Sequence, residues 1–284
     1  MIITRLEGGL GNQLFQYSIG RHLSIKNNTG LVLDTSNYLL DKNNRHYELG
    51  RYNIKAKTAN IITCIFVRLG KYIIPKITQH IRLPIKYVKE RNNYFNNEIL
   101  SEQRNIILDG YWQSEEYFKD IRDIILDDLT LVSNPDKENK KMLKRIKNSN
   151  SVCLHVRRDD YVSNPLLQKY HGSLTPKYYN KAINTICDRL TDPEFFIFSD
   201  EPEWCKRNII TDRPLTYVDI NGPDKAPEDL RLMSACNHFI IANSSFSWWA
   251  AWLAEKDGTI IIAPNGWYRE KDEGDIVPKR WLRI

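Results

Sequence analysis

The chain has 284 residues, of which 42% are hydrophobic and 27% charged, and its formal net charge at pH 7 is +6. This balance is typical of a globular protein and excludes a disordered one. The length exceeds one average domain and suits two domains of about 140 residues each. The sequence has no long block of basic residues, so its mild positive charge indicates an acidic ligand or an anionic surface rather than nucleic acid.

The cysteines and apolar segments indicate in which cellular compartment the protein is expected. Five dispersed cysteines without a Cys-x-x-Cys pair favour reduced thiols in a cytosolic protein over disulfides or a zinc site. The N-terminus lacks the basic and apolar regions of a signal peptide, and no apolar run is long enough to cross a membrane. Residues 60–79 have helical apolar spacing, which predicts a core-packing helix with a cationic outer face. A helix lying on a membrane is the alternative.

The first half begins with a strand, a glycine loop and a helix. Residues 2–6 are apolar, Gly8, Gly9 and Gly11 follow, and a helix is expected from about Leu14. Glycines permit positive φ and close approach of a ligand, and the helix that follows offers free N–H groups to an anion. The alternative is a tight turn that needs glycine for steric reasons. The spacing is not Gly-x-Gly-x-x-Gly, so it does not indicate a dinucleotide site.

Strands and helices alternate along the chain. Strands are expected at 2–6, 31–34, 105–112, 151–155, 195–198, 215–218, 238–242 and 259–263. Further helices are expected at 60–79, 114–131, 135–147, 175–190, from about 202, at 227–235 and from 248. Such alternation predicts α/β architecture with parallel sheets covered on both faces. The polar cluster at 148–150 suggests two Rossmann-like domains, 1–150 and 151–284, facing each other across a cleft.

One apolar strand ends in dense charge. Arg157 and Arg158 follow His155, and two neighbouring guanidiniums favour an anion, most simply phosphate, held by forked hydrogen bonds. The alternative is a structural turn in which Asp159 and Asp160 pair with the arginines. Loops at the carboxyl ends of parallel strands are where open α/β sheets bind ligands.

Other strand ends carry polar residues that would share this edge. Ser244 and Ser245 precede a helix and suit phosphate oxygens, whereas Asp200 and Asp229 suit ribose hydroxyls or base N–H groups. Together they predict a nucleoside diphosphate site. No Asp-x-Asp stands at a strand end and no Gly-x-Ser-x-Gly is present, so neither a divalent metal nor a serine hydrolase is expected.

Four motifs follow one another along the chain: GGLGNQLFQY at 8–17, HVRRDDY at 155–161, FSD at 198–200 followed by Trp204, and NSSFSWW at 243–249. In these motifs and their order, the chain resembles α-1,2-fucosyltransferases of glycosyltransferase family 11 from Ile2 to about Trp267. The resemblance implies a GT-B fold and inverting transfer of L-fucose from GDP-L-fucose to the 2-hydroxyl of a terminal β-galactoside. The domain 1–150 would serve the acceptor and the domain 151–284 the donor, and no metal or cofactor is expected.

The chain is also similar to the compact bacterial members. These imply synthesis of surface polysaccharide or lipopolysaccharide such as O-antigen, with a galactose-terminated oligosaccharide or lipid-linked glycan as acceptor. The expected location is the cytoplasm, at the inner face of the membrane, with peripheral contact and no transmembrane segment.

The resemblance assigns roles residue by residue. Arg157 is expected to hold the β-phosphate and stabilise the departing GDP, with Arg158 supporting it or the sheet edge. His155 is placed by the ribose or phosphates, Asp229 on guanine, and Asn12 on the far side of the cleft as a catalytic contributor. The remaining donor-binding candidates are Ser199, Asp200, Asn243, Ser244, Ser245, Phe246, Gly9 and Gly11.

Two departures from related sequences leave the catalytic base open. The family usually has glycine where Asp159 stands, and related α-1,6 enzymes carry a glutamate where this chain has Pro165. Asp160 is a candidate base, with a structural partnership to an arginine as its alternative. A different linkage or acceptor, or a non-catalytic protein that binds nucleotide sugars or glycans, are the alternative functions.

Overall fold

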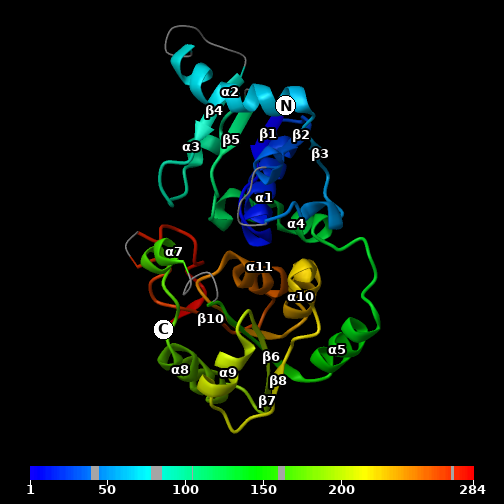
Figure 1. Ribbon diagram of the computed structural model, residues 1–284, viewed down its shortest axis with the longest axis vertical. Helices are drawn as coiled ribbons and strands as arrows, with labels where there is room; N and C mark the ends of the chain where they lie inside the picture. Colours follow the sequence, from blue (N-terminus) through cyan, green and yellow to red (C-terminus); the bar gives the residue numbers. More distant parts are fainter. Residues whose placement is uncertain (40–44, 78–84, 104, 159–163, 270–271) are drawn as a thin grey trace. The chain divides into compact units, whose positions relative to one another are not determined.

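The computed structural model describes residues 1–39, 45–77, 85–103, 105–158, 164–269 and 272–284. It divides into two compact units (Figure 1). Unit 1 comprises residues 1–132 and 274–276, and unit 2 comprises residues 133–273 and 277–284.

The sheet of unit 1 is entirely parallel, in the order β3-β2-β1-β5-β4. Its strands are β1 (Ile2–Arg5), β2 (Leu31–Asp34), β3 (Lys57–Thr58), β4 (Ile85–Lys89) and β5 (Asn105–Asp109). The short edge strand β3 and the strand β4 were not expected from the sequence. The central strand β1 pairs with β2 on one side and with β5 on the other.

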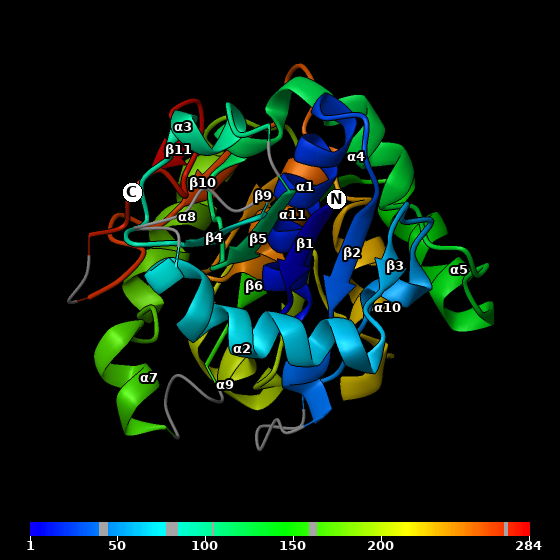
Figure 2. The same ribbon diagram turned by 90° about the horizontal axis from the view of Figure 1, so that it is seen from above.

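Two helices of unit 1 cover opposite faces of this sheet. The helix α1 (Leu10–Lys26) approaches so closely that a side chain at Gly20 would meet Thr4. The helix α2 (Ile61–Ile77) packs Val67 against Ile3 instead. Because successive residues of a strand point to opposite faces, Ile3 and Thr4 assign the two helices to different sides. Figure 2 shows α2 lying across the strands.

The outer surface of α2 differs from the prediction. A cationic outer face was expected for residues 60–79. In the described part of the helix, Arg68 is exposed, but Ile62 and Leu69 are exposed as well. The expectation of core packing is correct only for the side that carries Val67, so the predicted amphipathic pattern is incomplete.

The segment after β5 does not form the continuous helix expected at 114–131. It folds into the 3-10 turns η3 (Glu115–Tyr117) and η4 (Lys119–Ile121), followed by the short helix α4 (Arg122–Asp128). Phe118 has φ −149° and ψ 2°, which breaks the helical path. Its ring is fully buried, so tertiary packing overrides the local helical preference. The other short elements of unit 1 are η1 (Ser36–Leu39), η2 (Leu49–Arg51) and α3 (Asn97–Leu100).

Unit 2 also contains an entirely parallel sheet, in the order β11-β10-β9-β6-β7-β8. The strands are β6 (Asn150–Val156), β7 (Pro193–Ser199), β8 (Leu215–Tyr217), β9 (His238–Ile240), β10 (Ile261–Ala263) and β11 (Leu282–Arg283). Only β11 was not expected. The fully buried Val152 and Leu154 place β6 in the hydrophobic core, which fits its nearly continuous apolar sequence.

The helices of unit 2 are α5 (Lys137–Lys147), α7 (Pro165–Tyr170), α8 (Pro176–Cys187), α9 (Pro202–Asn208), α10 (Ala226–Met233) and α11 (Ser245–Ala254), with the 3-10 turn η5 (Pro223–Lys225). Proline stands in the first turn of α8, α9 and α10, where its missing N–H costs no hydrogen bond. Trp248, Trp249 and Trp252 of α11 are fully buried.

The boundary between the units falls before α5 and not at residue 150. Asn139 of α5 and Asn221 exchange two amide hydrogen bonds of 2.9 Å, which hold this helix within unit 2. The polar cluster at 148–150 connects α5 to β6 inside one unit, so its loop-like composition does not mark a domain boundary. The acceptor and donor roles of the two domains stay predictions.

A short stretch near the C-terminus belongs to unit 1. The backbone N–H of Phe95 donates to Asp275 Oδ2 at 2.8 Å, and the N–H of Asp275 donates to the carbonyl of Asn93. Unit 1 therefore combines segments far apart in the sequence. Across the described ranges, no helix is both long and apolar enough to cross a membrane, and all five cysteines are free thiols.

Candidate active site

The parallel register of unit 2 brings the predicted polar strand ends to one edge of the sheet. Val156 lies opposite Ser199, so Arg157 leaves β6 beside Asp200. On its other side, β6 pairs with β9, whose continuation leads to Ser244 and the start of α11. We call this edge of unit 2, from Arg157 to Asp200 and Ser245, the arginine edge. The prediction that these strand ends share an edge is confirmed.

The two arginines have different surroundings. Arg157 Nη1 lies 3.1 Å from Asp200 Oδ2. Arg158 Nε lies 3.1 Å from Glu201 Oε2, and its guanidinium carbon lies 4.2 Å from the centre of the Trp204 ring. Arg158 is therefore held by a carboxylate on one side and an aromatic face on the other, which favours the supporting role expected for it.

Asp200 organises the turn between the two strands. Its carboxylate accepts the backbone N–H of Arg158 at 3.0 Å as well as pairing with Arg157. Ser199 Oγ accepts the N–H of Glu201 at 3.0 Å. The contacts of Ser199 and Asp200 are thus structural, and their expected contact with the donor stays a prediction. Asp159 and Asp160, the acids proposed as internal partners or base, lie outside the described residues.

His155 is buried just before this turn and is 6% exposed. Its ring centre lies 5.8 Å from that of Phe246. Burial, and then the positive charge of Arg157, lower the pKa of His155 to about 3, so the imidazole is neutral at pH 7. Among the described residues, its Nδ1 has no hydrogen-bond partner. A buried nitrogen in this state is expected to meet a ligand or ordered water.

The start of α11 completes the edge. Ser244 is its N-cap, and the hydroxyl accepts the backbone N–H of Phe246 at 3.4 Å. Ser245 opens the helix, whose N–H groups and positive dipole end suit an anion. Ser247 instead donates to the carbonyl of Ser244 at 3.3 Å. The hydroxyl nearest the first helical turn therefore caps the helix, and the backbone supplies the anion-binding groups.

Asn243 fixes two loops behind this helix. Its Nδ2 lies within hydrogen-bond distance of the carbonyls of His171 at 3.0 Å and of Gly172 and Trp267 at 3.2 Å. The neighbouring rings of His171 and Tyr268 lie 5.2 Å apart. Its amide thus supports the edge from behind, and direct donor binding by Asn243 stays a prediction. Sequence reasoning missed the His171 and Tyr268 pair, which no motif marks.

Asp229 lies on the first turn of α10, away from the strand ends in the chain. Its Oδ1 accepts Asn221 Nδ2 at 2.9 Å, and Asn221 pairs with Asn139 of α5. Burial raises the pKa of Asp229 to about 6. A carboxylate of this kind can accept base N–H groups when ionised. Its assignment to guanine stays a prediction.

The glycine loop belongs to unit 1, and only one of its glycines uses positive φ. Gly8 has φ +77°, and a side chain there would come within 2.6 Å of Asn12 Nδ2. Gly9 is extended and Gly11 already lies within α1. Asn12 Oδ1 accepts Gln113 Nε2 at 2.9 Å. The interpretation as a tight turn that needs glycine is therefore correct for Gly8. Ligand contact by Gly9, Gly11 and Asn12 stays a prediction.

A buried glutamine holds this loop in place. Gln13 Nε2 donates to the carbonyls of Gly8 at 3.2 Å and His46 at 2.8 Å. Its Oε1 accepts the N–H of Glu48 at 2.9 Å. Gln13 is fully buried, so all three bonds are shielded from water. The glutamine of the motif thus has a structural role.

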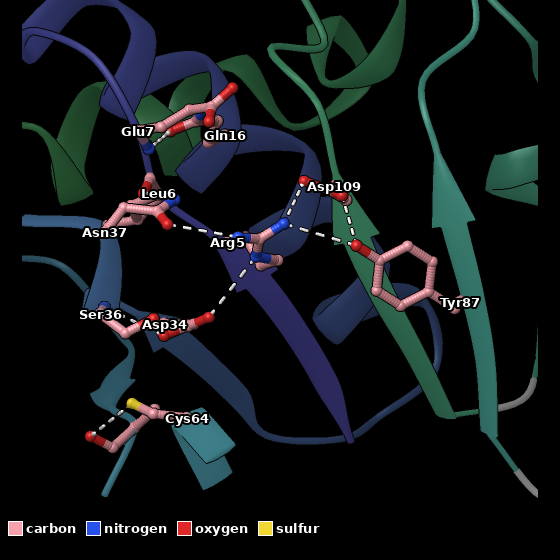
Figure 3. Close-up of polar contacts among 11 residues, drawn as sticks. Arg5, Leu6, Glu7, Gln16, Asp34, Ser36, Asn37, Cys64, Tyr87 and Asp109 are labelled. Atoms are coloured by element: carbon pink, nitrogen blue, oxygen red, sulfur yellow. Dashed lines mark hydrogen bonds and ion pairs between the residues drawn. The ribbon is translucent and has the colours of Figure 1, made fainter. Parts of the chain in front are cut away.

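Sequence reasoning missed an ionic cluster at the carboxyl edge of the unit 1 sheet (Figure 3). Arg5 Nη1 lies 2.7 Å from Asp109 Oδ1, and Arg5 Nε lies 3.7 Å from Asp34 Oδ2. Tyr87 donates its hydroxyl to Asp109, and Asn37 Oδ1 accepts Arg5 Nη2 at 3.2 Å. Charged residues ending three apolar strands were the available signal.

The cluster continues into the glycine loop. Asn37 Nδ2 donates to the carbonyl of Leu6 at 3.0 Å, and Tyr38 Oη donates to the carbonyl of Gly8 at 3.1 Å. Gln16 Oε1 accepts the N–H of Glu7 at 3.1 Å. The path of the loop from β1 to α1 is therefore fixed on both sides.

The two aromatics that end β5 divide between core and surface. Trp112 is fully buried, with φ +58°, whereas Tyr111 is 40% exposed. Glu90 accepts both of their backbone N–H groups, at 2.7 Å and 3.0 Å. Within the described residues, no group of three or more His, Cys, Asp or Glu side chains could hold a metal ion.

Two α/β units, each with an entirely parallel sheet, are the components of the GT-B fold. A solved structure of an Arabidopsis thaliana FUT1 mutant in complex with GDP has the same fold: it aligns over 94% of this chain and 71% of its own, with a TM-score of 0.56 and 10% identity. The model of Glycosyl transferase family 11 matches residues 1–284, and the chain belongs to that family.

Curated relatives are glycosyltransferases. An Escherichia coli alpha-1,2-colitosyltransferase is 34% identical over 100% of this chain and 99% of its own. The Escherichia coli O-antigen biosynthesis glycosyltransferase WbnK is 33% identical over 98% and 99%, respectively. A Bos taurus galactoside 2-alpha-L-fucosyltransferase, SEC1, is 31% identical over 61% of this chain and 50% of its own. The family and fold predicted from the sequence are confirmed, and the protein is an enzyme.

Proposed function

We propose that the enzyme transfers L-fucose from GDP-L-fucose to the 2-hydroxyl of a terminal β-galactoside, with inversion and without a metal ion. The observation that carries this proposal is the position of Arg157 at the carboxyl end of β6, two residues after the buried His155, whose ring centre lies 5.8 Å from that of Phe246 in α11. A fixed cation at this position can neutralise the diphosphate as it leaves, which is the task of a divalent ion in other transferases. The bovine relative supports the sugar and the linkage.

The residues of the arginine edge divide the work. Arg157 binds the β-phosphate, with its direction set by Asp200. The backbone N–H groups at Ser245 and Phe246 bind the remaining phosphate oxygens. His155 is neutral, so its Nδ1 can hydrogen-bond the ribose or a phosphate without adding a second charge. Asp229 reads guanine through its carboxylate.

In the proposed reaction, the oxygen of the galactose 2-hydroxyl forms a bond to the anomeric carbon of fucose. The bond between that carbon and the diphosphate oxygen breaks, and GDP leaves with the electron pair, stabilised by Arg157. The proton of the hydroxyl passes to a phosphate oxygen or to a side-chain base, for which Asp160 stays a candidate. Asn12 orients a reacting group from unit 1.

A second donor sugar is favoured by one observation. The full-length Escherichia coli relative is named as a colitosyltransferase. Colitose is fucose without its 3-hydroxyl, so a site that hydrogen-bonds this hydroxyl would reject colitose, whereas an apolar site would accept it. Turnover with the GDP derivatives of both sugars, compared at equal concentration, decides between them.

The WbnK relative supports a surface glycan as the biological acceptor. We therefore place the reaction in the cytoplasm at the inner face of the membrane, on a galactose-terminated oligosaccharide or a lipid-linked glycan. Linkage analysis of the product distinguishes the 2-hydroxyl from other positions on galactose.

The test is GDP release from the full chain incubated with GDP-fucose and a panel of galactosides in EDTA. We expect release that depends on the galactoside and continues in EDTA. Binding of GDP-fucose without turnover on any acceptor would support a non-catalytic binding protein instead. Complete loss of activity in EDTA, restored by a divalent ion, would contradict the metal-independent mechanism.

A further inference from the structure

The helix α2 carries large apolar residues on two opposite sides. Its inner side is marked by Val67, which is fully buried in a cluster with Ile3 and Ile107. Its outer side consists of residues that are between 44% and 74% exposed: Ile61, Ile62, Ile65, Phe66 and Leu69. Their spacing of i, i+1, i+4, i+5 and i+8 places them on one side of a helix. We call these five residues the outer α2 face.

Such a surface is unusual for a soluble domain. Exposed apolar residues are ordinary when they stand singly, but a contiguous group marks an interaction site. The other exposed large apolar residues of the described chain are spread along the sequence, as Ile25, Ile124, Val132 and Ile210 are. The outer α2 face also extends across the sheet, because α2 connects the edge strand β3 to the opposite edge strand β4.

The charge along the sequence that contains this helix has one sign. Residues 49–89 contain no acidic residue and the following basic residues: Arg51, Lys55, Lys57, Arg68, Lys71, Lys76, Arg82, Lys86 and Lys89. Two of them pair with carboxylates outside the segment, Arg51 with Glu48 at 3.3 Å and Lys86 with Glu102 at 2.9 Å. Arg68 is exposed on α2 itself. The segment thus combines an exposed apolar stripe with an exposed arginine and a basic sequence.

We propose that the outer α2 face docks on an anionic lipid bilayer. The apolar side chains would enter the boundary between headgroups and acyl chains, and the basic residues would lie at the level of the lipid phosphates. A second copy of the chain is a poorer occupant, because it would bring two segments of the same charge together. This surface supplies a physical contact for the inner-face location proposed above, and it does not depend on the identity of the donor or acceptor.

The test measures binding of the full chain to vesicles of phosphatidylcholine with and without phosphatidylglycerol. We expect flotation with the anionic vesicles that weakens as salt rises, and little with the neutral ones. The combined substitutions Ile62→Ser and Phe66→Ser should lower the partition coefficient by about tenfold or more. Arg68→Gln should lower it by about fivefold, the effect of one basic residue near an anionic surface.

The matched control is Ile210→Ser in unit 2, because Ile210 and Ile62 are both 74% exposed. We expect this variant to bind vesicles like the unchanged protein. Thermal melting should be unaltered in all variants because the substituted side chains are exposed, and fucose transfer to a soluble galactoside should persist, which separates this proposal from the catalytic one.

Three results would overturn the proposal. One is failure of the unchanged protein to bind anionic vesicles. Another is an equal loss of binding in the Ile210→Ser control. The third is a change from dimer to monomer in the Ile62→Ser and Phe66→Ser variant with unaltered vesicle binding, which would assign the face to a second copy of the chain.

Discussion

The carboxyl edges of the two sheets are built alike but have opposite electrostatic outcomes. In each, an arginine stands at the carboxyl end of a central strand: Arg5 is the last residue of β1, and Arg157 directly follows β6. Arg5 receives a carboxylate from both neighbouring strands, Asp34 on one side and Asp109 on the other.

In the part of unit 2 that the structure describes, Arg157 pairs with the acid that follows one neighbouring strand. Asp200 follows β7, whereas the strand on the other side leads to Ser244 and the N-terminus of α11. In unit 1 an acid follows or ends the strand on each side of the arginine. In unit 2 the strand on one side leads instead to the N-terminus of α11, whose backbone N–H groups suit an anion. The comparison shows that Arg5 is enclosed by two acids, whereas Arg157 lies at an edge that also carries a helix N-terminus. This difference supports the proposed role of Arg157 in binding a negatively charged ligand.

The largest expected effect comes from Arg5→Met. It would leave Asp34 and Asp109 buried without their cation, and removing one partner of a buried ion pair costs about 3–5 kcal/mol. We expect the free energy of unfolding, measured by urea denaturation at pH 7, to fall by this amount. A loss below about 1 kcal/mol would show that the cluster does not hold the sheet edge.

Arg157→Ala should act on turnover instead of stability. Loss of a group that stabilises the departing charge typically lowers kcat by about 10²–10³. The urea midpoint should fall less than in Arg5→Met, because Arg157 is more exposed than Arg5, 24% against 13%, and Asp200 keeps the backbone N–H of Arg158 as a partner. Steady-state kinetics with GDP-fucose measure the effect. Near-full activity in this variant would show that Arg157 has no part in the mechanism. The proposed difference in role between Arg157 and Arg5 would then be wrong.

The raised pKa of Asp229, about 6, predicts a pH-dependent affinity for GDP. Its ionised form accepts the guanine N–H groups, so binding should strengthen as pH rises through about 6 and weaken about tenfold per unit below it. Isothermal titration between pH 5 and 8 checks this. Asp229→Asn should abolish the pH dependence. The same pH dependence in the Asp229→Asn variant would show that Asp229 does not bind guanine.

The smallest effect is expected from Gly8→Ala. A non-glycine residue at φ +77° is strained, and its Cβ would approach Asn12 Nδ2, so we expect a loss of about 1–2 kcal/mol in unfolding free energy. Gly30→Ala is the matched control, because nothing lies within 4 Å of a side chain there. Equal urea midpoints in both variants would refute the steric role of Gly8.

Much of the fold could be predicted because apolar runs and turn residues act locally. The strand at Leu31–Asp34 was placed at its observed bounds, and the edge shared by Arg157 and Asp200 followed from parallel topology alone. The failures depend on contacts distant in sequence. Phe118 interrupts the helix expected at 114–131 because its ring is fully buried in the core.

The site was less accessible to sequence reasoning than the fold. The pairing of Arg157 with Asp200 and of Arg158 with Glu201 was missed because these acids follow the next strand. The pairing considered with Asp159 and Asp160 lies outside the described residues. The Arg5 cluster was missed because each of its members looks like an ordinary strand terminus, and only the sheet order places Arg5 between Asp34 and Asp109.

The return of residues 274–276 to unit 1 has a consequence for synthesis on the ribosome. Because chains emerge from the N-terminus, unit 1 stays without the carboxylate of Asp275 that accepts the Phe95 N–H until nearly the whole protein has been made. Unit 1 should therefore finish folding late, and a fragment ending at residue 132 should be less stable than the same unit in the full chain.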